Sequence, residues 1–360
     1  MLPTLRQRLA NQDLLKPASR APADEVRRLG AVQAQDYAGA KWALGQRCAG
    51  STDEQVESAF ADGAFVRTHV LRPTWHFVAP EDLRWMLALT APRIRAQMAY
   101  YDRKLELTDD VVRRSNTAIV AALAGGHQLT RAELARALSR AKLGPTSGQR
   151  LGHLMMHAEL DAVVCSGARR GKQFTYAPVD ERVPSAPHVP REEALAMLAD
   201  RYFTTRGPAT AQDFSWWSGL TVADAARAAR SIAPSLEHEE RDGRSYWWRA
   251  SEASGARRSP AVHLLPNYDE YFIGLKDRSA FGGRVERVAP DGRTAALSAH
   301  IVVIDGEIVG GWKRMVTGKR VAVELQLLAR ITPAERRAVA DQAVRHAAFF
   351  DLELTGIRDS

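Results

Sequence analysis

The chain has 360 residues, of which 45% are hydrophobic and 26% charged, and its formal net charge is +8. This composition is typical of a soluble globular protein that buries a substantial core in roughly two to three domains. Two widely spaced cysteines argue against a disulfide framework and a cysteine-bound zinc or iron-sulfur site, and no apolar run approaches the roughly 18 residues of a membrane span.

The positive charge is the first indication of a partner. Arginine supplies most of the excess, and its guanidinium group suits contacts with phosphates and bases. A pI near 9.7 therefore favours DNA binding, although a merely basic soluble protein would show the same value. The N-terminal stretch MLPTLRQRLANQDLL has neither a long apolar run nor a small-residue cleavage site, so we expect no signal peptide. We expect a cytoplasmic, nucleoid-associated protein.

The first predicted unit, residues 1–108, ends in a hairpin and a further helix. Pro22 is placed to begin the second helix, and the triplet Gln33-Ala34-Gln35 follows at the end of that helix. Two β-rich runs, FVRTHVL and TWHFV, are separated by Arg72-Pro73, which predicts a hairpin. The expected helices lie at 3–10, 23–32 and 54–60, with another that begins at Pro80.

The second predicted unit, residues 109–183, has the clearest pattern. Gly125-Gly126 stops one helix, and Thr130 with Glu133 forms a capping box that opens the next. The expected elements are helices at 116–123, 130–140 and 147–160 and strands at 162–166 and 173–177, joined by the basic loop 167–172. Three helices followed by a hairpin with a basic, glycine-flanked tip predict a winged helix.

The third predicted unit, residues 184–257, begins with a connector that has three prolines in seven residues. Asp242-Gly243 is a hairpin turn between LEHEE and SYWWR. The expected helices lie at 192–201, 210–217 and 222–232. We interpret the Trp216-Trp217 and Trp247-Trp248 pairs as core residues in preference to stacking platforms.

The last region, residues 258–360, changes to strands. Turns at Asp305-Gly306 and 317–319 suit antiparallel pairing. The expected elements are strands at 296–304, 307–316 and 320–328 and a helix that is capped by Thr332 and runs to about Phe350. We therefore predict an α+β fold with three tandem winged-helix domains followed by a small C-terminal β-barrel.

Five stretches together resemble a known family. They are VQAQD, RTHVLRPTWHFV, CSGARRGKQFTYAPVDERVP, LLPNYDEYFIGLKDR and IDGEIVGGWKR. They resemble the AlkZ/YcaQ group of bacterial winged-helix DNA glycosylases, which excise alkylated bases and unhook DNA interstrand crosslinks. The resemblance covers nearly the whole chain, and it implies that the three winged helices and the barrel form a C-shaped DNA-binding scaffold.

The resemblance also implies a catalytic motif. It is Gln-hydrophobic-Gln in the AlkZ branch and Gln-hydrophobic-Asp in the YcaQ branch. Gln33-Ala34-Gln35 matches the former, with a small middle residue, and Asp36 follows one residue too late for the latter. We therefore expect Gln33 and Gln35 to be catalytic, with no cofactor and no metal.

The chemistry of an alkylated base explains why amides would suffice. A purine alkylated at N7 is already positively charged, so it can depart without a proton. The enzyme then holds a water molecule and stabilises a developing oxocarbenium ion through oriented dipoles. We expect a monofunctional, monomeric DNA glycosylase that acts on double-stranded DNA containing alkylated or crosslinked purines, because no lysine in the triplet could form a Schiff base.

Further candidate residues lie elsewhere in the sequence. We expect Arg169, Arg170 and Lys172 of the basic loop to contact DNA phosphates or a minor groove, although a charged turn that only aids solubility has the same composition. The candidate lesion-pocket residues are Asp36, His69, Arg72, Trp75, His76 and Asp269. A packed hairpin would explain the two histidines equally well. His153 and His157 have the spacing of a metal pair, but residue 154 is Leu where a zinc protease needs Glu.

Two other classes of protein fit parts of this pattern. A winged-helix transcriptional regulator without catalysis is the main alternative, because fold alone does not determine function. A partner-binding scaffold would need neither the glutamine pair nor the basic loop. A regulator should prefer a DNA sequence, whereas a glycosylase should prefer a lesion.

Overall fold

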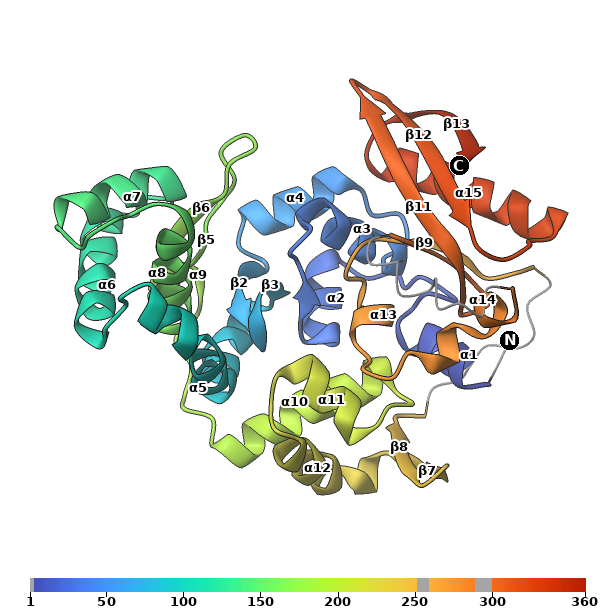
Figure 1. Ribbon diagram of the computed structural model, residues 1–360, viewed down its shortest axis with the longest axis horizontal. Coiled ribbons are helices and arrows are strands. Elements are labelled where there is room, and N and C mark those ends of the chain that lie inside the picture. Colours follow the sequence, from blue (N-terminus) through green and yellow to red (C-terminus); the bar gives the residue numbers. More distant parts are fainter. Residues whose placement is uncertain (1–2, 251–258, 289–299) are drawn as a thin grey trace.

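The computed structural model describes residues 3–250, 259–288 and 300–360 (Figure 1). The first unit consists of α1 (Pro3–Asn11), α2 (Pro22–Leu29), β1 (Val32–Gln33), α3 (Tyr37–Arg47), α4 (Asp53–Ala61), β2 (Val66–Val70), β3 (Arg72–Val78) and α5 (Pro80–Lys104). Its three strands form an antiparallel sheet in the order β1-β3-β2. The predicted hairpin is confirmed as β2 and β3.

The glutamine triplet begins in a strand, which corrects the predicted helix end. Helix α2 ends at Leu29 because Gly30 adopts a positive φ of 77°. The chain then extends, and Gln33 pairs with His76 across the sheet.

Helix α3 was not predicted from the sequence. Nine of its residues, from Gly39 to Arg47, are buried, so it has no polar face whose spacing would reveal a helix. A Cβ atom at Gly45 would lie 2.4 Å from the ring of Phe349. The glycine that weakens the helical signal is therefore required by close packing.

The second unit consists of α6 (Asp109–Leu123), β4 (Leu129–Thr130), α7 (Arg131–Arg140), α8 (Gly148–Leu160), β5 (Val164–Ser166), β6 (Thr175–Pro178) and α9 (Val179–Arg182). Its sheet order is β4-β6-β5. The predicted capping box is confirmed, because Thr130 and Glu133 exchange both of its hydrogen bonds. The helices bury a hydrophobic cluster of their own, drawn from residues 107–176.

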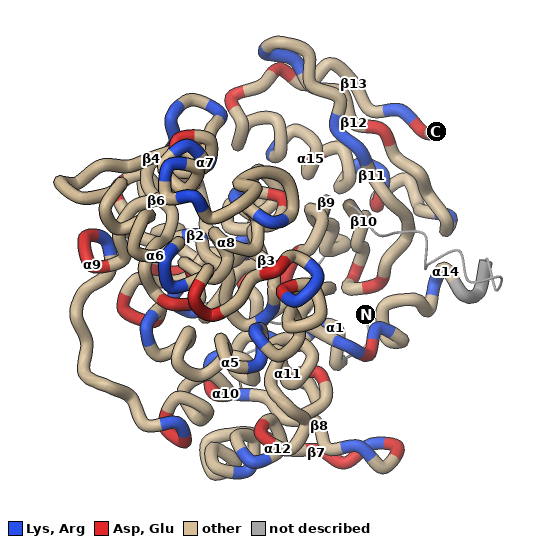
Figure 2. The backbone as a smooth tube through the Cα atoms, turned by 60° about the vertical axis from the view of Figure 1, so that its left-hand side comes forward, with Lys and Arg blue, Asp and Glu red and all other residues tan. Residues whose placement is uncertain are grey.

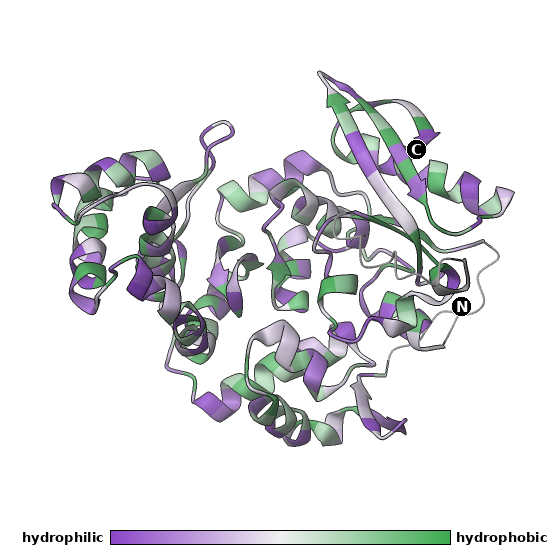
Figure 3. Ribbon diagram, viewed as in Figure 1, coloured by the Kyte–Doolittle hydropathy of each residue, from purple (hydrophilic) through white to green (hydrophobic). Residues whose placement is uncertain are grey.

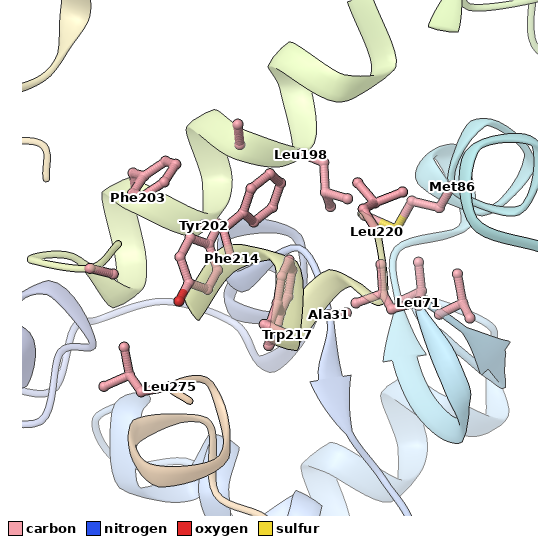
Figure 4. Close-up of a cluster of buried hydrophobic side chains, with 14 of the residues drawn as sticks. Ala31, Leu71, Met86, Leu198, Tyr202, Phe203, Phe214, Trp217, Leu220 and Leu275 are labelled. Carbon is pink, nitrogen blue, oxygen red and sulfur yellow. The ribbon is translucent and has the colours of Figure 1, made fainter. Parts of the chain in front are cut away.

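The third unit consists of α10 (Arg191–Arg206), α11 (Ala211–Ser218), α12 (Val222–Ser231), the short 3-10 helix η1 (Ala233–Ser235), β7 (Glu237–Arg241) and β8 (Arg244–Trp248). The predicted Asp242-Gly243 turn is confirmed, since both residues have positive φ. A bridge joins Ala209 to Trp247 of β8. Figure 4 shows side chains of α10 and α11 packed against Leu71 and Met86 of the first unit.

The C-terminal region consists of β9 (Val262–Leu265), α13 (Glu270–Ile273), η2 (Ser279–Phe281), α14 (Gly283–Val288), β10 (Ile301–Ile304), β11 (Glu307–Thr317), β12 (Arg320–Leu327), α15 (Pro333–Phe349) and β13 (Glu353–Asp359). Its sheet order is β13-β12-β11-β10-β9. Of the predicted strand at 296–304, residues 296–299 lie outside the described residues.

The predicted C-terminal β-barrel is wrong for the part of the chain that the structure describes. The two ends of the sheet, β9 and β13, do not pair with each other, so the sheet is open. Along β12, buried residues alternate with more exposed ones. Figure 3 shows hydrophobic and hydrophilic positions along the same strand. A helix and the first unit cover the buried face: Val323 shares one hydrophobic cluster with Val339 of α15 and Trp42 of α3. Burial against these elements removes the need for closure.

The units are arranged around the first one. The second unit and the C-terminal sheet lie on either side of it, and the β5–β6 loop and the β11–β12 hairpin project on the same side of the molecule (Figure 1). No helix among the described residues is long and apolar enough to cross a membrane.

Candidate functional site

The triplet Gln33-Ala34-Gln35 begins at the end of β1, where the first unit meets the C-terminal region. The backbone N–H of Gln33 donates to Oε1 of Glu270 at 2.8 Å. The side-chain Oε1 of Gln33 accepts a hydrogen bond from Nη2 of Arg72 at 2.7 Å. Only 5% of Gln33 is exposed. Because its backbone and its side chain are both held, the Gln33 amide has a defined orientation in the free protein.

Ala34 and Gln35 have opposite environments, as alternating residues of an extended chain do. Ala34 is fully buried in the core shared with the C-terminal region, whereas Gln35 is exposed. The N–H of Ala34 donates to the carbonyl of Trp75 at 2.7 Å, and the N–H of Trp75 lies 3.4 Å from Oε1 of Gln35. This alternation explains the apolar middle residue and leaves Gln35 open to solvent.

A cavity of about 400 Å³ lies next to the triplet, between the first and second units. Its walls combine aromatic rings with cations, among them Arg67, Trp75, Arg131, Lys172, Phe174 and Tyr176. The guanidinium Cζ of Arg67 lies 4.3 Å from the Trp75 ring and 4.4 Å from the Phe174 ring. Its Nε donates to the carbonyl of Ala34 at 3.0 Å, which ties the cavity wall to the triplet. Burial lowers the pKa of Arg67 to about 10, so it stays protonated at neutral pH.

The two histidines of the first hairpin differ in their partners. Nδ1 of His69 hydrogen-bonds to Glu159 of α8, which joins the first unit to the second. The His69 ring also lies 4.6 Å from the Trp75 ring. His76 is fully buried opposite Gln33. Burial holds the pKa of His76 well below its ordinary range, so this imidazole is neutral at physiological pH.

A buried charge pair supports the triplet. Oε2 of Glu270 accepts hydrogen bonds from Nη2 of Arg206 at 2.6 Å and from Nε1 of Trp217 at 2.9 Å. Glu270 and Arg206 are fully buried. The pair connects the third unit to the strand of Gln33. The sequence analysis selected Asp269 and not its neighbour Glu270, and no local pattern marks Arg206.

Two residues predicted for the lesion pocket have structural partners. Asp269 is buried and accepts two hydrogen bonds from the guanidinium of Arg47, at 2.8 and 3.0 Å. Asp36 caps α3 by accepting a backbone N–H of its first turn at 3.1 Å. The carboxylate that contacts the triplet is that of Glu270, the neighbour of Asp269 in the sequence. Of the predicted pocket residues, Arg72 and Trp75 hydrogen-bond to the triplet, and His76 pairs with Gln33 across the sheet.

The three basic residues of the β5–β6 loop have different surroundings. Nη1 of Arg169 lies 3.3 Å from Oε2 of Glu57, so this side chain folds back on the first unit. Arg170 pairs with Glu133 at 2.9 Å within the second unit. Lys172 is exposed and lines the cavity. The structure therefore brings Lys172 to the cavity, while carboxylates hold both arginines. Figure 2 shows further basic positions along β11 and β12.

The spaced histidines of α8 share one carboxylate. Nδ1 of His153 lies 2.9 Å from Oδ1 of Asp102, and Nε2 of His157 lies 3.2 Å from Oδ2 of the same residue. Nη1 of Arg95 contacts the other ring nitrogen of His157 at 3.0 Å. These contacts join α8 to α5. Within the described ranges, no group of three His, Cys, Asp or Glu residues is placed to hold a metal ion.

Three comparisons relate the chain to known proteins. The sequence model of a family described as DNA glycosylase AlkZ-like matches residues 26–349. An interstrand DNA cross-link repair glycosylase of Streptomyces sahachiroi is 26% identical over 315 residues, which cover 84% of this chain and 85% of that protein. The solved structure of the Streptomyces sahachiroi DNA glycosylase AlkZ superposes with a TM-score of 0.79 at 24% identity, over 100% of both chains. The last comparison establishes the mixed α/β fold.

Proposed function

This chain belongs to the AlkZ-like family of DNA glycosylases, and we propose that it is a monofunctional enzyme that hydrolyses the N-glycosidic bond of alkylated purines in duplex DNA. Its proposed substrates are N7-alkylguanine, bulky N7 adducts and interstrand crosslinks, the last of which is supported by the name of the Streptomyces relative. The observation that carries the proposal is the triplet Gln33-Ala34-Gln35, held beside a cavity with aromatic and cationic walls.

We assign different tasks to the two glutamines. Gln35 is exposed, so its carbonyl oxygen can accept a hydrogen bond from the attacking water. Gln33 is fixed by Arg72 and Glu270, so it presents an oriented dipole where the sugar becomes positively charged. A neutral amide is too weak a base to deprotonate water efficiently. The rate must therefore depend on a good leaving group.

The surroundings of the triplet favour a base that leaves without taking up a proton. His76 is neutral, and the carboxylate of Glu270 is occupied by Arg206 and Trp217. Neither is a ready acid at neutral pH. A purine alkylated at N7 already carries a positive charge, so it meets this requirement. Unmodified bases should be cleaved slowly or not at all.

The same proposal includes the architecture. We take residues 1–108, 109–183 and 184–257 as three tandem winged helices that surround the lesion as a monomer in the cytoplasm, associated with the nucleoid. In support, each unit contains a hairpin, and in each the second strand of that hairpin pairs with a short segment between two helices: β3 with β1, β6 with β4, and β8 with Ala209. This order is that of a winged helix. Lys172 at the hairpin of the second unit would contact DNA phosphate.

The test is excision from a duplex that carries one N7-methylguanine, measured as alkali-labile strand cleavage. We expect cleavage by the wild type and a large loss in Gln33→Ala and Gln35→Ala, with DNA binding retained. Gln97→Ala is the matched control, because Gln97 is an exposed glutamine on α5. Full excision rates in both triplet variants would remove the glutamines from the mechanism.

The substrate range decides between catalysis and regulation. If the wild type cleaves none of the three lesions (N7-methylguanine, a bulky N7 adduct and a crosslink), the catalytic proposal fails, and a preference for one DNA sequence would then identify a regulator. Family membership favours the enzyme.

A further inference from the structure

The Trp216-Trp217 pair divides into a core residue and a surface residue. Trp217 is fully buried, whereas 41% of Trp216 is exposed, so the prediction that both belong to the core is wrong for Trp216. Nε1 of Trp216 donates to the carbonyl of Ile273 at 3.1 Å, which fixes the ring. An exposed aromatic ring held in one orientation is typical of a binding surface.

Two arginines from distant parts of the chain approach this ring. The guanidinium Cζ of Arg72 lies 6.0 Å from the centroid of the Trp216 ring, and that of Arg278 lies 5.8 Å from it. Arg278 also packs on Phe272 at 4.4 Å. One exposed ring is therefore flanked by two positive charges.

Neither arginine has a carboxylate partner within 4 Å in the described part of the chain. Nε of Arg72 and Nη2 of Arg278 are buried without a hydrogen-bond acceptor there. Burial lowers the pKa of both residues, which reflects the cost of keeping two charges out of water. An anion between them would reduce that cost.

The buried carboxylate of Glu270 raises the pKa of Arg72 and so offsets part of its charge, but its oxygens are hydrogen-bonded to other groups. Oε2 of Glu270 is bonded to Arg206 and Trp217, and Oε1 accepts the N–H of Gln33. Within the described residues, neither Arg72 nor Arg278 is hydrogen-bonded to a carboxylate, so both guanidinium groups can bind an anionic ligand. Arg72 also donates to Oε1 of Gln33. The same guanidinium group would therefore contact both the ligand and the catalytic triplet.

We propose that Arg72, Arg278 and Trp216 form a clamp for one backbone phosphodiester of the DNA strand that carries the lesion. This inference rests on the proposed function and specifies which residues next to the triplet bind the DNA backbone. A phosphodiester has two free oxygens and so offers one acceptor to each guanidinium. The exposed Trp216 ring packs against the neighbouring nucleotide. By fixing the strand beside Gln33, the clamp places the damaged sugar against the triplet.

The experiment replaces single phosphates by neutral methylphosphonates. Duplexes with a tetrahydrofuran abasic analogue carry one methylphosphonate at each position near the analogue, and binding by the wild type and Arg278→Gln is measured over a range of salt concentrations. For the wild type, we expect one position whose neutralisation weakens binding by at least about tenfold. Arg278→Gln should be insensitive at that position, and its salt slope should fall by about one.

Two variants serve as controls. Arg278→Lys keeps the charge and should keep the sensitive position. Arg336→Gln removes the same charge on α15, where Arg336 pairs with Asp359 at 2.8 Å, and it should leave the sensitive position unchanged. Equal sensitivity of the wild type and a folded Arg278→Gln at every phosphate overturns the clamp.

The wild-type scan alone also decides the matter if Arg278→Gln does not fold. A wild type that binds and excises, yet shows no sensitive phosphate near the lesion, overturns the clamp and leaves the proposed function intact. A wild type that does not bind the abasic duplex overturns both.

Discussion

Replacing Asp269 by asparagine should destabilise the protein without slowing base excision. The carboxylate accepts two hydrogen bonds from Arg47, and both side chains are fully buried. Asparagine keeps the shape but leaves a buried guanidinium without a counter-charge, which costs about 3–5 kcal/mol. The unfolding entropy is about 2.1 cal/mol/K per residue, so it totals about 0.76 kcal/mol/K for a chain of 360 residues. Dividing the loss of free energy by this entropy gives a fall in melting temperature of about 4–7 °C.

The assay is urea unfolding followed by circular dichroism, together with excision measured well below the melting transition. Asp351→Asn is the matched control, because Asp351 pairs with Lys319 at the surface, where the two side chains are 88% and 83% exposed. We expect that control to leave the free energy of unfolding almost unchanged, because solvent screens an exposed ion pair. A loss below about 1 kcal/mol in Asp269→Asn, or a fall in the excision rate at full folding, would refute the structural role of Asp269.

Three further predictions concern packing, pH and DNA contact. Gly219 has a φ of +72°, and an added Cβ would lie 2.1 Å from the carbonyl oxygen of Leu71, whereas Gly243 has a φ of +68° and open space. Gly219→Ala should therefore cost about 1–3 kcal/mol more in urea unfolding than Gly243→Ala; equal losses would contradict this contact. Burial lowers the pKa of His346 from its ordinary value of 6.5 to about 3. As the pH falls below 6.5, His346 is therefore protonated in the unfolded chain before it is protonated in the folded protein. The free energy of unfolding should decrease by up to about 1.4 kcal/mol per pH unit over this range. His346→Gln should flatten this decline between pH 6.5 and 4, and an unchanged slope of stability against pH would exclude His346 as its source. Lys172→Gln should weaken binding to all DNA sequences alike and reduce the salt slope by about one; a wild-type slope would remove Lys172 from the phosphate contacts.

Much of the local structure could be predicted because its causes lie within a few residues. The Thr130 and Glu133 capping box and the Asp242-Gly243 turn depend on side chains and backbone angles that are close in the sequence. The triplet Gln33-Ala34-Gln35 could be singled out for the same reason, since its alternation of polar and apolar residues is local.

The missed elements and partners have causes that are distant in the sequence. Helix α3 is buried on nearly all sides, so no periodic pattern marks it. Among the described residues, the C-terminal sheet stays open because α15 and the first unit pack on its buried face. Strand propensity does not predict which elements pack on a sheet.

The candidate site shows the same division. The sequence by itself determined the local elements, the basic charge and the glutamine triplet. Only the tertiary structure decided what holds the triplet: Glu270 is 237 residues from Gln33 along the chain, and Arg206 lies on another unit. It also decided that Asp269 pairs with Arg47 and that Trp216 is partly exposed near two arginines. The physical reason is that burial and charge pairing depend on which surfaces meet, and that choice is made by the packing of whole units and not by neighbours in the chain.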